Sequence, residues 1–435
     1  MENTALLKAG EKRSALYRVF ADGQEIPVFE GHDFHYVHLF TSDILPVEVQ
    51  VAETVTSVAI RPSRRGKKFR LEEQKISFSV SCGDYLSLEI NDDITRPLII
   101  FAEKKMTYDV YDGYTVLRYP AGSYNYVGEL VLSSNTVVIL EEGAVIEGSI
   151  SGVGVHNVRI LGNGILHYDT KPERLDKPIH IDRSENIEIN GITIHGYHTW
   201  NLCLRRTRNI LIENVKILAD AVWSDGIDLV GCEDALVRHI FIKNEDDCLC
   251  IKSSGAKGDH FSGNDVRRIL FEDCVLWSGP RGNSMEIGYE TNNAVIENIT
   301  FRHIDILHRE TQANKFNRAI ISIHNAGNAV IRHITYEDIY AESTDENLVM
   351  IGHMYQPDWG EGVGRIQNIV IRSLTLAGGT LRPSKILAVA ECSNERRVTE
   401  DILFENLNIL GTPVKSAETA LACGFVLDAD HIRFR

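Results

Sequence analysis

Three short acidic segments contain the side chains whose types and spacing could perform chemistry. They span 223–228, 244–252 and 283–288, and the first two carry Asp225, Asp246 and Asp247. Asp225 precedes the adjacent pair by about 20 residues, close to the shortest repeat period of a solenoid protein. When carboxylates lie close together they repel one another, and at least one of them keeps its proton to a higher pH. A protonated carboxyl beside an ionised one supplies the acid and the base that hydrolysis of a glycosidic bond requires.

The same acidic pattern has two plainer explanations. An Asp-Asp pair taken alone is typical of a solvated turn, and clustered carboxylate oxygens also bind calcium. The catalytic interpretation therefore depends on whether the fold brings the three side chains together.

A repeated strand pattern from about residue 130 onward would bring them together. Short runs rich in Ile and Val begin with Asn or Asp at positions 157, 186, 209, 234, 368 and 401. Neighbouring copies are separated by roughly 23 to 33 residues, and strand-only repeats of this length are typical of a parallel β-helix. Asn suits the sharp turns of such a solenoid because it tolerates left-handed backbone. Residues one coil apart lie about 5 Å apart along the axis, which places Asp225 beside Asp246 and Asp247.

Residues 1–107 follow a different pattern and are expected to form a separate domain. Segments 76–81 and 85–90 alternate apolar and polar residues, as half-buried strands do, and Gly83-Asp84 suits a turn between them. We predict an all-β protein with a small antiparallel β-sandwich over 1–107 and a parallel β-helix, which carries the acidic segments, over 108–435.

Composition narrows the possible partners. A formal net charge of −16 argues against nucleic acid and anionic membranes, which require a basic surface. No stretch approaches 18 apolar residues, so no membrane helix is expected. The N-terminus lacks the apolar core of a signal peptide, which predicts a cytoplasmic protein, or a secreted one if the chain is a processed form. Eight cysteines without a Cys-x-x-Cys pair predict neither a disulfide framework nor a zinc site, and no cofactor is expected.

The acidic segments resemble a known family. The runs Ser224-Asp225-Gly226-Ile227-Asp228 and Asp246-Asp247-Cys248-Leu249-Cys250-Ile251-Lys252-Ser253 resemble the polygalacturonases, glycoside hydrolase family 28. The related dextranase and isopullulanase family, family 49, shares the three aspartates and has a β-sandwich ahead of its β-helix. The resemblance covers about residues 108–410. It implies a right-handed, pectin-lyase-like β-helix and hydrolysis with inversion, with Asp246 as general acid and Asp225 and Asp247 activating water, although the roles of the adjacent pair stay open.

The chain departs from family 28 where that family grips the galacturonate carboxylate. The family's Gly-His-Gly-x-Ser-Ile-Gly corresponds to 282–288, where Asn283 replaces the histidine. Its Arg-Ile-Lys corresponds to 318–320, where Arg318 is kept and Ile320 replaces the lysine. Losing such a charge-assisted hydrogen bond weakens binding by about 1.5–3 kcal/mol, which favours an uncharged substrate.

Other substrate-binding residues are predicted from side-chain type and position. Glu286, followed by Gly288 and an aromatic residue, resembles an acidic-x-Gly-aromatic run of family 49. Aromatic faces stack on sugar rings, and segment 354–362 reads as a loop of the kind that carries binding residues. The complete set of predicted substrate-binding residues is Trp223, Lys252, Asn283, Glu286, Tyr289, Arg318, His324, Tyr355 and Trp359.

Together these observations predict an inverting glycoside hydrolase that cleaves α-glycosidic bonds of a poly- or oligosaccharide, a neutral α-glucan of the dextran or pullulan kind. One alternative is a polygalacturonase acting on pectic galacturonides. Another is a calcium-dependent polysaccharide lyase, in which the three aspartates would bind calcium and a Lys or Arg would act as base. The last is a β-helix that binds glycans without catalysis.

Overall fold

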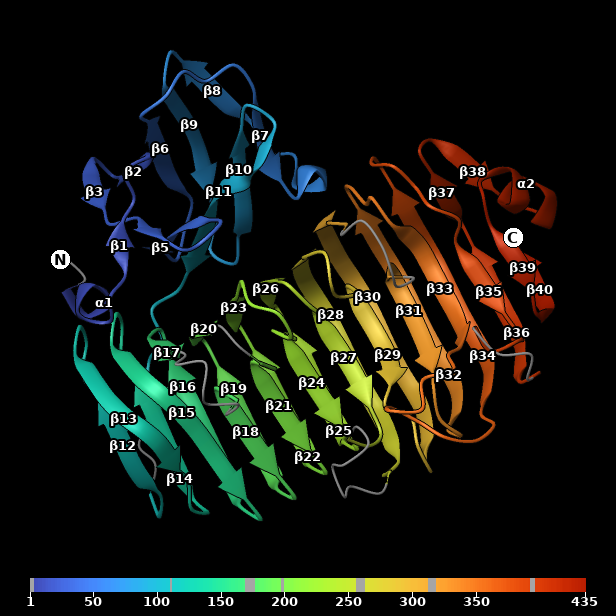
Figure 1. Cartoon of the computed structure of the whole chain (residues 1–435). Helices are drawn as coiled ribbons and strands as arrows, with labels where there is room; N and C mark the ends of the chain where they lie inside the picture. Colours follow the sequence, from blue (N-terminus) through green and yellow to red (C-terminus); the bar gives the residue numbers. More distant parts are fainter. Residues whose placement is uncertain are drawn as a thin grey trace.

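The computed structural model describes residues 4–109, 112–168, 177–196, 199–255, 263–311, 318–391 and 396–435. The chain forms a long solenoid of short strands with a smaller β-domain seated on one side of it (Figure 1). This architecture confirms the predicted β-helix preceded by a β-sandwich. Within the described ranges, no helix is both long and apolar enough to cross a membrane.

The N-terminal domain is a sandwich of two sheets. A short helix, α1 (Thr4–Lys8), precedes it, and a 3-10 turn, η1 (Ser63–Arg65), interrupts it. The six-stranded sheet has the spatial order β1 (Lys12–Arg13), β4 (Phe29–Glu30), β5 (His35–Phe40), β11 (Asp93–Glu103), β10 (Tyr85–Ile90) and β7 (Val58–Arg61). The five-stranded sheet has the order β3 (Gln24–Ile26), β2 (Tyr17–Ala21), β6 (Leu45–Val51), β9 (Lys75–Val80) and β8 (Phe69–Glu72). The alternation in β9 buries Ile76, Phe78 and Val80 in the core of the sandwich.

The strand connections of this domain differ from those of the expected antiparallel sandwich in two ways. β9 and β10 belong to different sheets, so the turn at Gly83, where φ is +88°, carries the chain across the sandwich. β5 and β11 pair in parallel, with His35 opposite Leu98. The parallel pair arises because the intervening chain visits the opposite sheet in β6, β8 and β9 before it returns.

The solenoid consists of three parallel sheets. The first contains β12 (Thr115–Tyr119), β14 (Thr136–Leu140), β16 (His156–Gly162), β19 (Glu185–Asn190), β22 (Arg208–Glu213), β25 (Glu233–Arg238), β36 (Val398–Glu405) and β40 (Asp430–Phe434). The second contains β13 (Tyr124–Val131), β15 (Val145–Val153), β17 (Ile165–Tyr168), β20 (Thr193–Gly196), β23 (Lys216–Leu218), β26 (Phe241–Asn244) and β37 (Leu407–Ile409). Four long strands contribute to both: β28 (Val266–Ser278), β30 (Val295–Arg309), β32 (Val330–Ala341) and β34 (Arg365–Leu376). The third contains β18 (Ile179–Asp182), β21 (Leu202–Arg205), β24 (Ile227–Val230), β27 (Leu249–Lys252), β29 (Met285–Tyr289), β31 (Ala319–Asn325), β33 (Asn347–His353), β35 (Lys385–Leu387) and β39 (Val426–Asp428).

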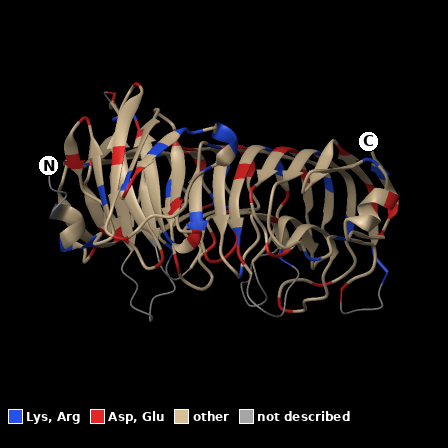
Figure 2. Cartoon of the chain, turned by 90° about the horizontal axis from the view of Figure 1, so that it is seen from above, with Lys and Arg blue, Asp and Glu red and all other residues tan. Residues whose placement is uncertain are grey.

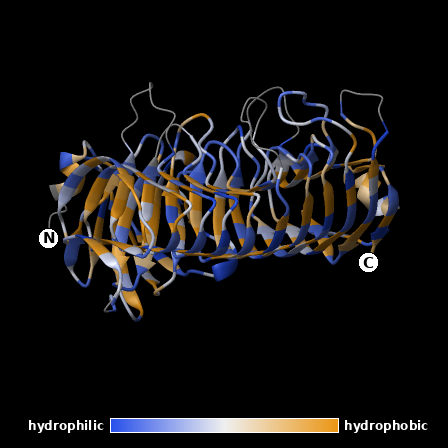
Figure 3. Ribbon diagram, turned by 90° about the horizontal axis from the view of Figure 1, so that it is seen from below, coloured by the Kyte–Doolittle hydropathy of each residue, from blue (hydrophilic) through white to orange (hydrophobic). Residues whose placement is uncertain are grey.

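Neighbouring coils are held in register by stacked apolar residues inside and stacked asparagines at the turns. Ile, Val and Leu side chains from all three sheets form one continuous core, and Figure 3 shows the strands mainly hydrophobic. Asn157, Asn186 and Asn209 have φ values of +54°, +57° and +54°. Their amides form a ladder, with Asn186 donating to Asn157 at 3.0 Å and Asn209 donating to Asn186 at 3.1 Å. The repeat seen in the sequence is therefore the coil of the solenoid.

The N-terminal domain packs on the outer face of the second sheet. Aromatic residues of the domain, such as Phe34 and Tyr85, share a buried cluster with Phe241 and Trp277 of the solenoid. Buried polar contacts also cross the boundary, including Lys216 with Glu103 at the end of β11. The domain thus leaves the third sheet uncovered by this contact. The boundary predicted at 107 lies between β11 and β12.

The C-terminal coil ends in a small cap. β38 (Thr412–Val414) pairs antiparallel with β37, and α2 (Ala417–Ala422) begins at Ser416, whose side chain accepts from Thr419 N. Val414, Ala420 and Phe425 join the apolar core of the solenoid. Acidic and basic residues are interspersed along the chain from one end of the molecule to the other (Figure 2).

Candidate active site

The three predicted aspartates lie at the start of neighbouring strands in the third sheet. Asp225 precedes β24, and Asp246 and Asp247 precede β27. The two strands pair in register, and Gly226 N donates to Asp247 O at 2.7 Å, so Asp225 lies beside Asp247 one coil away. Because these residues lie in turns, the adjacent Asp246 and Asp247 escape the alternation of a regular strand, which would point them to opposite faces. The structure therefore brings together the three carboxylates that the coil spacing predicted.

A lysine links Asp225 to a fourth carboxylate, Asp228. Lys252 Nζ donates to Asp225 Oδ2 at 2.9 Å and to Asp228 Oδ1 at 2.7 Å, and all three side chains are buried. Burial raises the pKa of Asp225 well above its ordinary range, and the Lys252 ammonium acts against that rise. Burial alone would favour the neutral amine, but the two carboxylates raise the pKa of Lys252 well above its usual value. Lys252 therefore stays charged and fixes both carboxyl groups.

Asn283 fixes the orientation of Asp247. Asp247 Oδ1 accepts from Asn283 N at 2.7 Å and from Asn283 Nδ2 at 2.8 Å. The amide oxygen of Asn283 in turn accepts from Ala319 N at 2.9 Å and from Ser322 Oγ at 2.8 Å. This chain of bonds leaves the amide one orientation, with its NH₂ toward the carboxylate. Asn283, at the position that corresponds to a histidine of family 28, thus fixes the orientation of Asp247.

Asp246 is held by the backbone of its neighbour. Its Oδ1 accepts from Asp247 N at 3.1 Å. Burial, followed by the negative charge of Asp247, raises the pKa of Asp246 to about 7, while the Arg318 guanidinium acts against that rise. A carboxyl that keeps its proton near neutral pH can donate it to a reacting oxygen.

Most of the remaining predicted residues form an aromatic and polar wall beside these carboxylates. The Tyr289 ring stacks on His324 at 4.6 Å and contacts Trp359 at 4.9 Å. Arg318 Nη1 donates to the Tyr289 hydroxyl at 2.6 Å. His324 Nδ1 lies 3.0 Å from both oxygens of Glu286, one coil away, and both side chains are fully buried. The buried Glu286 carboxylate therefore fixes the orientation of the His324 imidazole.

Two predicted aromatic residues lie apart from this wall. Trp223 is 64% exposed in the turn two residues before Asp225, and Tyr355 is 52% exposed after β33. Neither ring is in contact with another aromatic ring of the described chain. Trp223 thus stands at the surface close to the carboxylates in sequence, whereas the structure does not join Tyr355 to the cluster.

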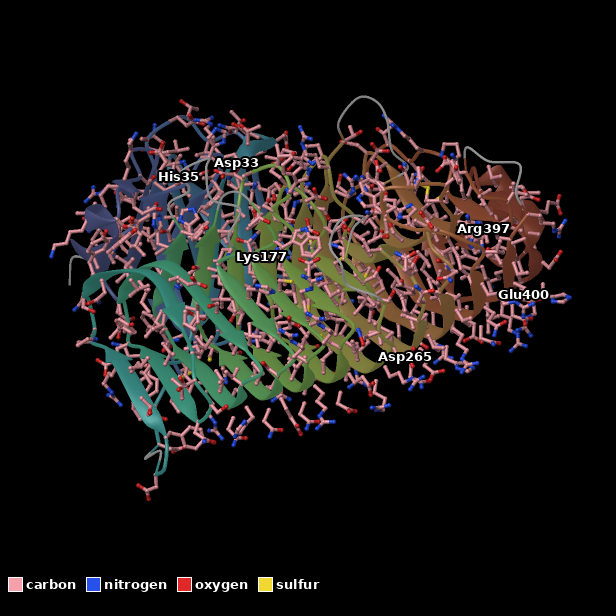
Figure 4. All side chains as sticks on the ribbon, turned by 60° about the horizontal axis from the view of Figure 1, so that its bottom comes forward. Asp33, His35, Lys177, Asp265, Arg397 and Glu400 are labelled. Atoms are coloured by element: carbon pink, nitrogen blue, oxygen red, sulfur yellow. The ribbon has the colours of Figure 1, made fainter. Side chains whose placement is uncertain are left out.

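Two residues that the sequence analysis missed, Lys177 and Trp200, lie close to Lys252. Lys252 Nζ lies 3.6 Å from the centroid of the Trp200 ring, and Lys177 Nζ lies 5.0 Å from the same ring. Figure 4 shows Lys177 over the middle coils of the solenoid. Trp200 stands one coil before Asp225, because Leu202 pairs with Ile227. Aligning the third-sheet strands by coil would have found Trp200, and the same alignment relates Asp228 to Lys252.

The arrangement can perform acid–base chemistry on a bound glycan. It contains a carboxyl whose pKa is raised to about 7, that of Asp246, and two others, those of Asp225 and Asp247, fixed by an ammonium and an amide. The ammonium of Lys252 lies beside Asp225, where a calcium-dependent lyase would place its cation. The described residues at this site therefore suit hydrolysis better than cation binding.

Comparisons with known proteins find relatives by sequence. A protein described as a probable polygalacturonase from Vitis vinifera is 29% identical over 177 residues, which are 40% of this chain and 34% of that protein. A probable exopolygalacturonase B from Neosartorya fischeri is 24% identical over 222 residues, which are 45% of this chain and 46% of that protein. The chain thus matches these curated relatives over less than half of their length.

Solved structures share the fold. The family 28 exopolygalacturonase of Yersinia enterocolitica is 11% identical with a TM-score of 0.53, covering 90% of this chain and 97% of that chain. Dex49A from Penicillium minioluteum is 14% identical with a TM-score of 0.63, covering 97% of this chain and 94% of that chain. The sequence model of glycosyl hydrolases family 28 matches residues 124–424, a range that contains every residue of the site described above. On this match, which spans more than half of its length, the chain belongs to glycosyl hydrolases family 28.

Proposed function

We propose that this protein is a glycoside hydrolase that cleaves α-linked galacturonides with inversion of configuration. The observation that carries the proposal is the set of three adjoining carboxyl groups in which Asp246 keeps its proton near neutral pH while Asp225 and Asp247 are held by Lys252 and Asn283. Membership of family 28 and the descriptions of the curated relatives support the reaction class.

In the proposed reaction Asp246 gives its proton to the oxygen of the leaving sugar as the glycosidic bond breaks. Asp225 and Asp247 hold a water molecule on the opposite face of the ring, take a proton from it, and direct its oxygen to the anomeric carbon. Lys252 keeps Asp225 in place, and Asn283 does the same for Asp247. Asp246 ends ionised and the base carboxylate ends protonated; the base releases its proton to solvent and Asp246 takes one up before the next turnover.

The substrate proposal replaces the neutral α-glucan that the sequence analysis favoured. That preference rested on Ile320 in place of a lysine and finds no support among the comparisons, which favour the galacturonide alternative. Ile320 is fully buried in the apolar core, so this position does not face a ligand. Arg318, beside Asp246 and Tyr289, and Lys177, over Trp200, supply positive charge for a uronate carboxylate.

The proposal is tested by measuring reducing-sugar release from polygalacturonate, dextran, pullulan and their short oligomers, with Asp246→Asn in parallel. Proton NMR of the first product anomer reports inversion or retention. We expect release from the galacturonides alone, with the inverted anomer formed first and activity lost in the variant.

Other outcomes identify the rivals. An unsaturated product absorbing in the ultraviolet, formed only without chelator, would establish a lyase. Cleavage confined to dextran or pullulan would restore the neutral substrate. Glycan binding without turnover, unchanged in Asp246→Asn, would make the protein a binding module.

A further inference from the structure

Four groups of His, Cys, Asp or Glu side chains in the described part of the chain bring three ligand atoms within 4.8 Å of one another. They are Asp225, Asp228 and Cys250; Glu400, Asp401 and His431; His32, Asp33 and Asp220; and Glu11, His167 and His195. In the first group the Lys252 ammonium already neutralises the carboxylates. The second group lies at the surface, and in the third Asp33 is paired with Lys243.

The fourth group is buried and has a different composition. Glu11, His167 and His195 are 8%, 4% and 1% exposed. A single carboxylate oxygen, Glu11 Oε1, lies 2.8 Å from His195 Nδ1 and 3.2 Å from His167 Nε2. Two imidazoles and one carboxylate are a donor set that zinc uses in proteins. Ligand atoms about 2.0–2.1 Å from a tetrahedral ion lie roughly 3.3 Å from one another, so the two Glu11–imidazole spacings need to change by only a few tenths of an ångström, and all three ligand atoms already lie within 4.8 Å of one another.

The solenoid itself sets the two imidazoles side by side. His167 in β17 pairs with His195 in β20, one coil away. Their neighbours Leu166 and Ile194 point into the apolar core, so the alternation of the strands turns both histidines to the outer face of the second sheet. Glu11 comes from the N-terminal domain, 156 residues before His167. The three ligands therefore converge only when the domain is seated on the solenoid.

The surroundings favour a cation over a neutral hydrogen-bonded cluster. The rings of Phe34 and Tyr36 each lie 5.9 Å from His195, with their planes tilted by 63° and 69°, and they shield the site from water. Within the described ranges, no Lys or Arg forms an ion pair with Glu11. Its partners are the imidazoles of His167 and His195, and a buried carboxylate is costly unless a cation compensates it.

We propose that Glu11, His167 and His195 bind a divalent transition-metal ion of the zinc kind, which fastens the N-terminal domain to the solenoid. These three ligands occupy three of the four positions of a tetrahedral ion. The sequence gives no Cys-x-x-Cys or paired-histidine signature because Glu11 lies 156 residues before His167 and His195 follows His167 only after a whole coil. The ion's role is structural, since the site lies on the second sheet and the carboxylates of the active site lie on the third.

The test uses the full chain, freed of metal by dialysis against a chelator and titrated with ZnCl₂. Bound zinc is measured by mass spectrometry after removal of free ion, and the melting temperature is recorded at each point. We expect one zinc ion per chain and a rise in melting temperature with zinc concentration, since an ion that binds only the folded state stabilises it. Titration with Co²⁺ gives a second readout, because tetrahedral cobalt absorbs visible light.

Three variants separate a metal site from a hydrogen-bonded contact. Glu11→Gln and His195→Gln keep the size of the side chain and are expected to weaken zinc binding at least tenfold and to abolish the thermal shift. His308→Gln is the matched control, because His308 Nε2 contacts Glu89 across the same domain boundary at 2.9 Å without a third ligand. It should bind zinc like the original protein.

The proposal is overturned if the unaltered chain retains no zinc, or if zinc binding is the same in Glu11→Gln and His195→Gln as in His308→Gln. If a variant fails to fold, the cobalt spectrum of the unaltered protein decides: octahedral bands without any thermal shift would equally reject the site. Reducing-sugar release does not enter this test, so its outcome is independent of the proposed hydrolysis.

Discussion

Lys252 Nζ and Asp225 Oδ2 form a buried ion pair of 2.9 Å between residues 27 positions apart in the chain. The pair joins two successive coils of the third sheet, and Asp228 makes it a three-membered group. Its geometry explains how the carboxyl groups of Asp225 and Asp228 tolerate burial near Asp246. Removal of the Lys252 charge should therefore affect both carboxyl groups.

Lys252→Met should lower the free energy of unfolding by about 3–5 kcal/mol, because two buried carboxyl groups then lose their partner. Denaturant titration at constant pH measures the change. Arg208→Met is the matched control, since Arg208 and Glu185 form an exposed pair of 2.6 Å and such pairs contribute at most about 1 kcal/mol. Equal destabilisation by the two substitutions would contradict the assigned role of Lys252.

The pH dependence of kcat/KM should have an alkaline limb near pH 7. The proposed reaction needs protonated Asp246, whose pKa is raised to about 7, so the rate falls as pH rises through that value. Asp246→Asn should lower kcat by about 10²- to 10⁴-fold and remove the limb. Burial also raises the pKa of the neighbouring Glu245 to about 7, so Glu245→Gln is the decisive control. A limb that vanishes in Glu245→Gln and survives in Asp246→Asn would show that the acid was misassigned.

Arg318→Gln should weaken the action on galacturonides more than that on their methyl esters. Loss of a charge-assisted hydrogen bond costs about 1.5–3 kcal/mol, which corresponds to roughly a 10- to 100-fold lower kcat/KM on the charged substrate. Since Arg318 also lowers the pKa of Asp246, the alkaline limb should move to higher pH. Steady-state kinetics on the two substrates measure both effects. Equal losses of kcat/KM on the galacturonide and on its methyl ester would mean that Arg318 supports the site without binding the substrate carboxylate.

The asparagine ladder predicts an order among substitutions at one position. Asn186→Ala should destabilise the fold by about 2–3 kcal/mol, because Ala is strained at a φ of +57° and because the bonds to Asn157 and Asn209 are lost. Asn186→Gly loses the same bonds but tolerates the backbone, so it should cost about 1 kcal/mol. Thermal unfolding of the two variants tests this order, and a glycine variant no more stable than the alanine variant would show that φ is not the source of the strain.

The coil spacing made the centre of the site predictable. A strand repeat of known length turns sequence distance into spatial distance, and for that reason a separation of one coil between Asp225 and Asp247 sufficed to place them together. The strand alternation of 76–81 likewise predicted β9 within one residue. Both inferences depend only on local periodicity, which the chain carries in its own residues.

The remaining features of the fold and of the site depend on tertiary contacts that local periodicity does not encode. Lys177 and Trp200 reach the site because they directly precede the third-sheet strands β18 and β21. The parallel pairing of β5 and β11 is decided by which sheet the intervening strands join. Glu11 meets His195 only through the docking of two domains. In each case the partner is fixed by tertiary packing.

The register of the solenoid restricts how the length of the molecule can change. The third-sheet strands β18, β21, β24 and β27 pair in the same register from coil to coil, and loops absorb the unequal lengths of the coils. A whole coil can therefore be gained or lost without shifting any side chain to the wrong face, whereas inserting one residue within a strand would turn the residues after it in that strand to the opposite face. The distance from the catalytic carboxylates to either end of the protein can then vary only in steps of about 5 Å.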